Sequence, residues 1–464
     1  MLSLNLIELT LALDRRAFFI SMQNFPNTLP EWLSLLETRH SKEIDMGLER
    51  VASVKNQLNI QFTCPLIIVG GTNGKGSTCA MLESILLQAG YSVGLYSKPH
   101  FLDFNERARI NGEQVKDEVF IKTFAEIEVH RADVSLTYFE FTTLAICKLL
   151  ADAELDVVIL EVGLGGRLDA VNVFDGDVTI VTSVDIDHID YLGDTREKIG
   201  FEKAGIFRAN KTAICSDPIP PQSLIEHAKN IGADLRLFGR DFNYNGDKQQ
   251  WNFAGRSQRR NSLGYPSLRG ANQLLNASAV LAALEVLKQE LPVGAQEIRN
   301  GLAMVDLPGR FQVMPGRPVV VLDVAHNPHA AATLSQNLDN MGFHAYTYAV
   351  FGSMLDKDID GVIAQIKGKI DHWCLTDLPL PRAATALQIN DKLVEAGVVQ
   401  NAEQSIQNFD SPEAAYTYAF NKAGENDRIV VFGSFLTVAG VMKARKLKSA
   451  DSGRQSEIGT ANTH

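Results

Sequence analysis

Residues 70–78, which read Gly-Gly-Thr-Asn-Gly-Lys-Gly-Ser-Thr, constrain the fold of this chain more than any other segment. They follow the apolar run Leu66–Val69, which predicts a buried strand, and precede Cys79–Ala89, which predicts a helix. This order is typical of a phosphate-binding loop, because glycines let backbone N–H groups approach an anion and the helix adds its positive dipole end. Lys75 is placed to reach the β- and γ-phosphates of a nucleotide.

The loop departs from the general pattern G-x-x-x-x-G-K-[ST] at two positions. Val69 stands where the first glycine is expected, and Gly76 follows the lysine. The hydroxyl groups therefore come one place later, at Ser77 and Thr78. This departure argues against an ordinary GTPase or an ATPase motor.

Apolar runs alternate with helix-like stretches through the first 300 residues. The runs Val93–Tyr96, Val157–Glu161 and Val178–Val184 predict further strands. Because they are apolar on both faces, we expect parallel strands covered by helices, as in a doubly wound α/β fold. We therefore predict an ATP-binding α/β domain over residues 23–306. Polar residues 236–268 interrupt the alternation and predict a small antiparallel excursion.

The remaining chain is predicted to form a second, smaller domain. After a linker at 307–314 the strand–helix alternation restarts, which predicts a Rossmann-like α/β domain over residues 315–445. We expect residues 1–22 to be an N-terminal extension and the polar residues 446–464 to be a disordered tail. In folds of this kind, ligands bind beyond the carboxyl ends of the strands and between domains.

Composition excludes several classes of protein. The net charge of −11 disfavours a nucleic-acid binder, which normally carries a basic face. No stretch approaches about 18 uninterrupted apolar residues, so no membrane span is expected. The five cysteines are far apart and form no C-x-x-C pair, which disfavours a disulfide framework and favours a reducing compartment. We predict a cytoplasmic protein that acts as a monomer.

Polar side chains end several of the predicted strands. Glu161 ends a buried strand near the phosphate loop, where a carboxylate can hold Mg²⁺, although a cap or a loop salt bridge is the alternative. Residues 185–190 offer three carboxylates and an imidazole, either for a metal or general-base role or as a solvated acidic face. Residues 323–328 and 352–358 end successive strands of the second domain and predict an edge that faces a ligand. Lys203 alone gives no signal.

Nine segments, spread over nearly the whole chain, match one family in that family's order. They are GTNGKGS at 71–77, PHFLDFNERARING at 99–112, LTYFEFTT at 136–143, EVGLGGRLDA at 161–170, DHIDYLG at 187–193, EKAGIF at 202–207, LPGRFQ at 307–312, DVAHNPHAA at 323–331 and VFGSFLTVAG at 431–440. On these segments the chain resembles the bacterial folylpolyglutamate synthases, including their bifunctional dihydrofolate synthase members, in the Mur ligase superfamily.

The resemblance implies an ATP-dependent amide ligase. ATP would phosphorylate a carboxylate to an acyl phosphate, and the amino group of L-glutamate would then attack it and release phosphate. The implied acceptors are dihydropteroate and tetrahydrofolate polyglutamates. The implied cofactors are ATP and Mg²⁺ at two sites, with K⁺ as a further candidate.

The resemblance also implies roles for individual residues. The nucleotide-binding positions are Gly71, Thr72, Asn73, Gly74, Lys75, Gly76, Ser77, Thr78, Asn276, Arg310 and Asp323. The catalytic residues are Lys75, His188, Lys203 and His326. Among these, Lys203 matches a carbamylated lysine that helps to hold a second Mg²⁺. The metal ligands are Glu161, His188 and Ser97. The acceptor pocket matches Ile44, Asp45, Met46, Thr137, Tyr138, Phe139, Glu140, Leu168, Asp169 and Ala170.

One departure from the family concerns the metal site. The family places a metal-binding serine directly before Pro99, where this chain has Lys98. A protonated lysine cannot ligate Mg²⁺. Either Ser97 or water takes the place of the serine, or Lys98 neutralises phosphate charge itself, or the metal site is partly disabled. Leu436, where histidine is common, is a lesser departure.

Three alternatives to the bifunctional ligase stay open at this point. A monofunctional folylpolyglutamate synthase shares much of the pattern. A Mur-type ligase would act on a peptidoglycan precursor and would not turn over dihydropteroate. A non-enzymatic relative that lost catalysis through Lys98 would bind ATP without releasing phosphate.

Overall fold

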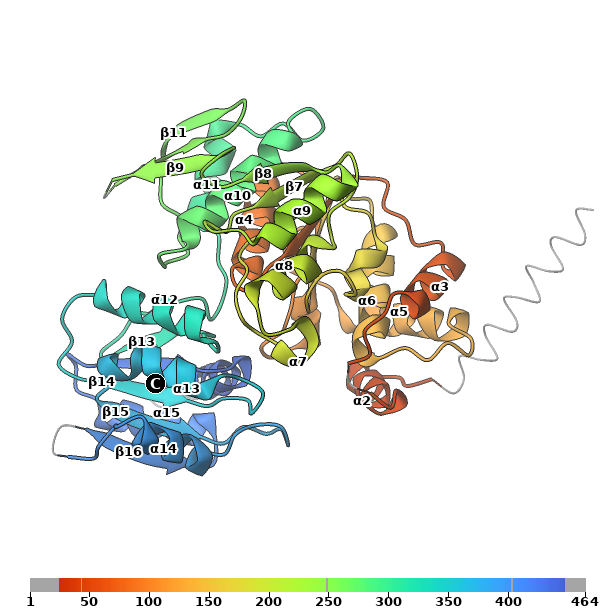
Figure 1. Cartoon of the computed structure of the whole chain (residues 1–464). Coiled ribbons are helices and arrows are strands. Elements are labelled where there is room, and N and C mark those ends of the chain that lie inside the picture. Colours follow the sequence, from red (N-terminus) through yellow and green to blue (C-terminus); the bar gives the residue numbers. More distant parts are fainter. Residues whose placement is uncertain (1–24, 43, 248, 402–403, 447–464) are drawn as a thin grey trace, which may run out of the picture.

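Two α/β domains make up the computed structural model, which describes residues 25–42, 44–247, 249–401 and 404–446 (Figure 1). The predicted doubly wound first domain and smaller α/β second domain are confirmed. The predicted N-terminal extension and all but the first residue of the predicted tail lie outside the described residues. No described helix is long and apolar enough to cross a membrane.

The first domain is built on an eight-stranded sheet with the order β4-β3-β2-β5-β1-β6-β7-β8. Its strands are β1 (Leu66–Gly70), β2 (Val93–Tyr96), β3 (Ala108–Ile110), β4 (Glu113–Gln114), β5 (Val157–Glu161), β6 (Val178–Val181), β7 (Thr212–Cys215) and β8 (Asp234–Leu237). All neighbours are parallel except the antiparallel β2–β3–β4 segment. Strand β1 pairs with β5 on one side and β6 on the other, so the phosphate loop leaves the sheet between the ends of these two strands.

Helices cover both faces of this sheet (Figure 1). One face packs against α2 (Leu29–Arg39), α3 (Glu49–Gln57), α5 (Asp117–His130), α6 (Tyr138–Ala151), α8 (Arg196–Ala204) and α9 (Gln222–Ile231). The other packs against α4 (Lys75–Gln88), α10 (Gln273–Val286) and α11 (Ala295–Met304). Short helical turns are η1 (Phe104–Arg107), η2 (Ala170–Val173) and α7 (Ile189–Leu192). Every residue of β1 and β5 is buried, which explains their Val, Ile and Leu content.

Residues 243–263 form the antiparallel excursion that the sequence predicts. Its strands are β9 (Asn243–Gly246), β10 (Trp251–Ala254) and β11 (Arg259–Leu263), in the order β11-β10-β9. Burial alternates along β10, so that Trp251 and Phe253 lie in the core beside α10, while Asn252 and Ala254 are only half-buried.

The second domain is a six-stranded sheet with the order β12-β13-β17-β14-β15-β16. Its strands are β12 (Gln312–Met314), β13 (Val319–Leu322), β14 (Thr347–Phe351), β15 (His372–Thr376), β16 (Ser405–Phe409) and β17 (Arg428–Phe432). One face packs against α12 (Pro328–Asp339), α13 (Ile359–Ile366) and α14 (Ala386–Glu395), and η3 (Lys367–Lys369) follows α13. The other packs against α15 (Pro412–Lys422) and the helical residues 435–446.

The junction between the domains differs from the prediction. Strand β12 pairs antiparallel with β13, so residues 312–314 belong to the second sheet and not to the linker. A three-residue edge strand carries too short a pattern to be recognised from sequence. The other domain boundaries stay predictions.

Helix α12 lies on the side of the second domain that faces the first (Figure 1). Ala271 N donates to Asn337 Oδ1 over 3.1 Å, which joins the loop before α10 to α12. A second contact, which is apolar, joins the rings of Phe101 and Phe435, whose centroids are 5.1 Å apart. The carboxyl ends of the first sheet's central strands therefore face the second domain.

Candidate active site

The phosphate loop has a backbone that only glycine permits at two positions. Gly71 has φ +142°, and a Cβ there would lie 1.9 Å from Thr182 Oγ1. Gly74, which precedes the first residue of α4, has φ +88°, and a Cβ there would lie 2.6 Å from Asn276 Oδ1. A side chain at either position would clash with the neighbouring Thr182 or Asn276 and would require a strained backbone. The loop thus has the form that the sequence predicts for an anion-binding turn.

The chain leaving β6 holds the loop in place. The sequence predicted a strand up to Val184, but β6 ends at Val181, because the next residues turn to bond the loop. Thr182 Oγ1 and Ser183 Oγ donate to Asn73 O over 2.6 and 3.1 Å. Thr72 Oγ1 accepts from Asp185 N over 3.0 Å. These hydroxyl groups fix the loop at the edge of the sheet.

The Lys75 side chain folds back onto the phosphate loop and bonds its backbone carbonyl groups. Its Nζ donates to Gly71 O over 2.9 Å and to Thr72 O over 3.1 Å. Burial lowers the pKa of Lys75, while the negative charges of Glu161 and Asp187 act in the opposite direction. The amino group therefore stands at the centre of the site, within the loop that would hold a phosphate.

Glu161 ends β5 beside the loop and is only 2% exposed. Its Oε2 accepts from Lys98 N over 3.1 Å. Burial raises the pKa of Glu161, and the charge of Lys75 opposes the rise. A buried carboxylate next to a phosphate loop fits the metal ligand that the sequence predicted, although this role stays a prediction.

The other two predicted metal ligands point to different neighbours. Ser97 Oγ donates to Glu106 O over 3.5 Å. His188 Nε2 lies 3.3 Å from Lys357 Nζ. Burial lowers the pKa of His188 to about 4, so the imidazole is neutral at pH 7, with its Nε2 facing the Lys357 amino group. Within the described chain, no three histidine, cysteine, aspartate or glutamate side chains form a group that could hold a metal ion.

Asp187 connects the two domains. Lys357 Nζ donates to its Oδ1 over 2.7 Å, and Asn327 Nδ2 donates to its Oδ2 over 3.2 Å. His326 Nε2 lies 3.6 Å from the same Oδ2, while its Nδ1 donates to a backbone carbonyl. Burial alone would raise the pKa of Asp187, but His326 and Lys357 outweigh it and hold the pKa well below its usual range.

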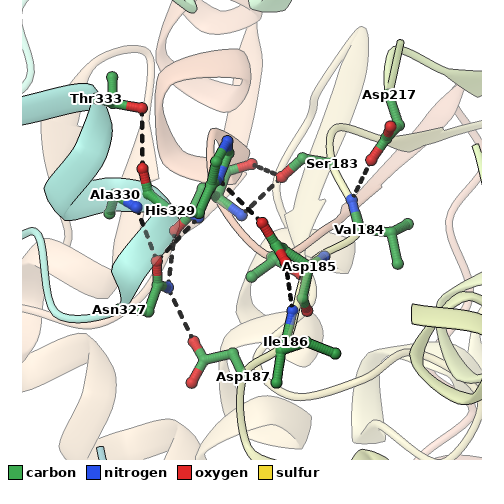
Figure 2. A network of polar contacts seen from close by, with 12 residues as sticks. Ser183, Val184, Asp185, Ile186, Asp187, Asp217, Asn327, His329, Ala330 and Thr333 are labelled. Atoms are coloured by element: carbon green, nitrogen blue, oxygen red, sulfur yellow. Dashed lines mark hydrogen bonds and ion pairs between the residues drawn. The ribbon is translucent and has the colours of Figure 1, made fainter. Parts of the chain in front are cut away.

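A pair of asparagines joins the phosphate loop to the start of α12, where Figure 2 shows Asn327 beside His329 and Ala330. Asn73 Nδ2 donates to Asn327 Oδ1 over 3.3 Å, and Asn327 Nδ2 donates to Asn73 Oδ1 over 3.2 Å. Asn327 Oδ1 also accepts from Ala330 N as the cap of α12. His329 Nδ1 lies 3.0 Å from Asn73 Nδ2 and 3.8 Å from Asp185 Oδ2. The loop therefore abuts the second domain.

Asn327 and Lys357 were not singled out by sequence reasoning. Both lie in the polar clusters that end the first strands of the second domain, and these clusters were the only signal for them. Their partners in the first domain are 140 and 170 residues away in the chain. No local pattern reports such a pairing.

Lys203 lies on α8 with 3% of its surface exposed. Burial lowers the pKa of Lys203 to about 7, and the charge of Lys75 adds to the effect. A large share of this amine is therefore neutral near pH 7, as reaction with CO₂ requires. The burial could not be inferred from the sequence around Lys203.

Three predicted nucleotide-binding residues lie outside the phosphate loop. Asn276 and Arg310 lie against the loop, and Asp323 lies near Arg310. Asn276 is buried against Gly74, and a Cβ on Gly76 would lie 3.6 Å from Arg310 Nη2. Asp323 accepts from two backbone N–H groups over 2.8 Å each, and burial raises its pKa against the charge of Arg310. Ser77 Oγ accepts from Gln273 Nε2, whereas the buried Thr78 Oγ1 has no hydrogen-bond partner among the described residues.

Two of the predicted acceptor-pocket residues are held around Arg50. Arg50 donates to Asp45 O over 2.7 Å and to Glu140 Oε1 over 2.9 Å, and it lies 2.9 Å from Asp45 Oδ2. Glu140 and Thr137 also form the capping box that starts α6. Arg50 thus fastens residues 44–46 to the start of α6, next to Tyr138 and Phe139.

Asp169 organises the glycine-rich loop after β5. Its Oδ2 accepts from Gly163 N and Leu164 N over 2.9 Å each, and its Oδ1 accepts from Val171 N over 3.0 Å. Leu168 and Ala170 flank it. A Cβ on Gly163 would lie 2.8 Å from Phe139 Cζ, so this loop and α6 meet at that ring. Burial raises the pKa of Tyr138 to about 12.

Comparison with known proteins places this arrangement among glutamate-adding ligases. A family model described as the Mur ligase middle domain matches residues 69–284, and one described as the Mur ligase, glutamate ligase domain, matches residues 309–435. The chain is 44% identical to the dihydrofolate synthase/folylpolyglutamate synthase of Escherichia coli, over 89% of this chain and 95% of that protein. The corresponding protein of Haemophilus influenzae is 40% identical, over 89% and 96%.

Solved structures agree with these relatives. E. coli FolC in complex with DHPP and ADP matches with a TM-score of 0.86 at 43% identity, over 91% of this chain and 99% of that chain. A bifunctional folylpolyglutamate synthase/dihydrofolate synthase with Mn, AMPPNP and L-glutamate bound matches with a TM-score of 0.83 at 42% identity, over 90% and 98%.

Proposed function

The chain belongs to the dihydrofolate synthase/folylpolyglutamate synthase family of the Mur ligases, and from this premise we propose which acceptors it uses and which residues act. It is an ATP-dependent ligase that joins glutamate to folates and uses a divalent metal ion. The proposed acceptors are dihydropteroate, which gives dihydrofolate, and tetrahydrofolate with its polyglutamates. The proposed setting is the cytoplasm, where the chain works as a monomer.

The observation that carries the proposal is the contact between the phosphate loop and the second domain through Asn73 and Asn327. Phosphates bound at the loop would lie at the seam of two domains, where water is excluded and an acyl phosphate is protected. Phosphoryl transfer requires positioning and charge neutralisation more than covalent help from the protein. Lys75 and the loop amides would orient the γ-phosphate toward the acceptor carboxylate.

The buried Glu161 offers the donor type that suits Mg²⁺ as the divalent ion, because a carboxylate oxygen is the ligand that Mg²⁺ prefers. His188, which contacts Lys357 in this structure, would have to exchange that contact for the ion. When bound, the ion neutralises negative charge on the phosphates. K⁺ is a further candidate ion. His326, fixed through its Nδ1, is proposed to stand near the reacting phosphate.

Carbamylation of Lys203 would supply a second carboxylate for metal binding. Only a neutral amine reacts with CO₂, and burial lowers the pKa of Lys203 to about 7, against about 10.4 for an ordinary lysine. The N–C bond forms as the amine adds to CO₂, and one proton leaves the nitrogen. The product turns a buried cation into an anion beside Lys75, whose charge then favours it.

Arg50 is proposed to position the residues of the acceptor pocket by bonding Asp45 and Glu140. Arg50→Met is expected to raise the KM for dihydropteroate about tenfold, or 1.4 kcal/mol, and to leave the KM for ATP unchanged, because residues 44–46 lose their link to α6. Steady-state kinetics with each substrate varied would measure both constants. Lys42→Met is the control, since Lys42 also contacts Asp45 but from an exposed position. A parallel rise in the KM for ATP would count against a pocket-specific role.

Phosphate release from ATP and Mg²⁺ with L-glutamate tests the proposed function directly. Release with both dihydropteroate and tetrahydrofolate is the expected result. Release with tetrahydrofolate alone would support the monofunctional alternative and remove dihydropteroate from the proposal. Release only with a peptidoglycan precursor would favour a Mur-type ligase on another acceptor.

A further inference from the structure

Lys98 carries a buried amino group that has no hydrogen-bond acceptor among the described residues. Its Nζ lies 4.2 Å from the ring centroid of Tyr96 and 4.4 Å from that of Phe139, so two aromatic faces enclose it. A lysine ammonium has three donors, and burying donors without acceptors is costly. Contact with the two rings offsets part of this cost but satisfies none of the donors.

The nearby carboxylates are already bonded elsewhere. The Asp169 carboxylate accepts three hydrogen bonds, all from backbone N–H groups of its own loop. Glu161 accepts from the backbone N–H of Lys98 and forms no ion pair with its side chain within 4.0 Å. The Tyr96 hydroxyl pairs with Thr143 over 3.0 Å. The donors of Lys98 are therefore left for a group that the protein itself does not supply.

Lys55 shows what a structural lysine looks like in this fold. Its Nζ also lies over an aromatic ring, 4.9 Å from the centroid of Phe174. Unlike Lys98, however, it donates to Val173 O over 2.8 Å. A lysine that only packs thus keeps a backbone acceptor, and Lys98 does not.

The position of Lys98 indicates the kind of ligand. It lies between Phe139, in the proposed acceptor pocket, and Glu161, beside the phosphate loop. The Lys98 ammonium group can only donate hydrogen bonds, so it suits an anionic end of the acceptor molecule. The ring of the acceptor suits it less well, because the ring edge carries donors as well as acceptors. The anion that must come to the phosphate loop is the carboxylate to be phosphorylated.

We propose that Lys98 Nζ binds the reacting carboxylate of the folate acceptor and holds it toward the phosphate loop. This inference rests on the proposed acceptor. The two rings keep the ammonium in place while the acceptor is absent, and the carboxylate exchanges those contacts for charge-assisted hydrogen bonds. It also gives a role to a residue that departs from the serine of the family at this position.

The test measures binding without turnover, by calorimetry on the full chain with ADP and Mg²⁺ present. The two probes are dihydropteroate and its analogue that lacks the carboxylate group. The wild type should bind dihydropteroate at least about tenfold more tightly than the analogue. Lys98→Met should lose this preference while still binding the analogue, and Lys98→Arg should keep part of it.

Lys55→Met is the matched control, because it removes an aromatic-stacked lysine outside the site and should leave the preference unchanged. An unchanged preference in Lys98→Met, or an equal loss of affinity for both probes, would overturn the inference while the proposed function stood. ADP affinity reports that each variant is folded. A wild type that binds neither probe would instead overturn the proposed acceptor, and the inference with it.

Discussion

Replacing Lys203 by alanine is expected to lower kcat for phosphate release by about 10²- to 10³-fold without unfolding the protein. The size follows from removing a carboxylate that would help to hold the divalent ion, whose charge neutralises the transferring phosphoryl group. Lys203 is 3% exposed, and its pKa is lowered to about 7, so it is suited to carry a carbamate and poorly suited to serve as a solvated cation. Steady-state phosphate release at saturating ATP measures the effect.

Two observations separate a carbamate from a purely structural lysine. The wild type incubated with ¹³C-bicarbonate should show a carbamate carbon signal by NMR that Lys203→Ala lacks. Lys198→Ala, on the same helix but at an exposed position, should match the wild type in both rate and spectrum. Near-normal turnover in Lys203→Ala would show that no carbamate is needed.

Lys357→Met is expected to weaken the coupling between the two domains by about 3 kcal/mol. Lys357 and Asp187 are each only 10% exposed, and removing one partner of a buried pair leaves the other charge uncompensated. Urea unfolding followed by tryptophan fluorescence reports both domains, because Trp32 and Trp251 lie in the first and Trp373 in the second. The domains should unfold in separate steps in the variant.

The effect of Lys357→Met should depend on pH. The pKa of Asp187 lies well below its usual range in the folded protein, so its stabilising contribution is present above an unfolded pKa of about 3.9 and is lost only far below it. Without Lys357 the pKa of Asp187 in the folded protein rises. The loss of stability in the variant should therefore shrink once the pH falls below that raised pKa. Lys369→Met, which breaks an ion pair of the same domain at the surface, should cost less than about 1 kcal/mol at any pH. Equal costs for both variants would contradict the conclusion that Asp187 connects the two domains.

The sequence predicted elements whose signals are local. The phosphate loop, the buried strands beside it and the antiparallel excursion all follow from glycine spacing and apolar patterns, and the structure contains them. The short strands β3, β4 and β12 were not predicted because two or three residues carry no periodicity, and the longer strands β7, β8, β15 and β16 were not predicted either. Residues 182–184 were predicted as part of the strand but lie outside it, because the hydroxyl groups of Thr182 and Ser183 bond the phosphate loop.

The candidate site was predicted less completely than the fold. Motifs identified Lys75, Glu161 and the strand-end clusters, but not the pairing of Asp187 with Asn327 and Lys357, which depends on how two domains meet. The sequence also could not show that the Asp169 carboxylate accepts hydrogen bonds from backbone N–H groups, or that the Glu140 carboxylate caps the start of α6. Such groups were expected to face a ligand, and the structure gives them a supporting task as well.

The two asparagines between the phosphate loop and α12 form a reciprocal pair in which each amide is both donor and acceptor. Such a pair carries no net charge and does not titrate. The hydrogen bonds between the two amides therefore do not depend directly on acidity or ionic strength, whereas the contact of Asn327 with the Asp187 carboxylate and the Lys357–Asp187 ion pair do. The domain contact thus combines an uncharged pair with charged contacts that respond to solution conditions.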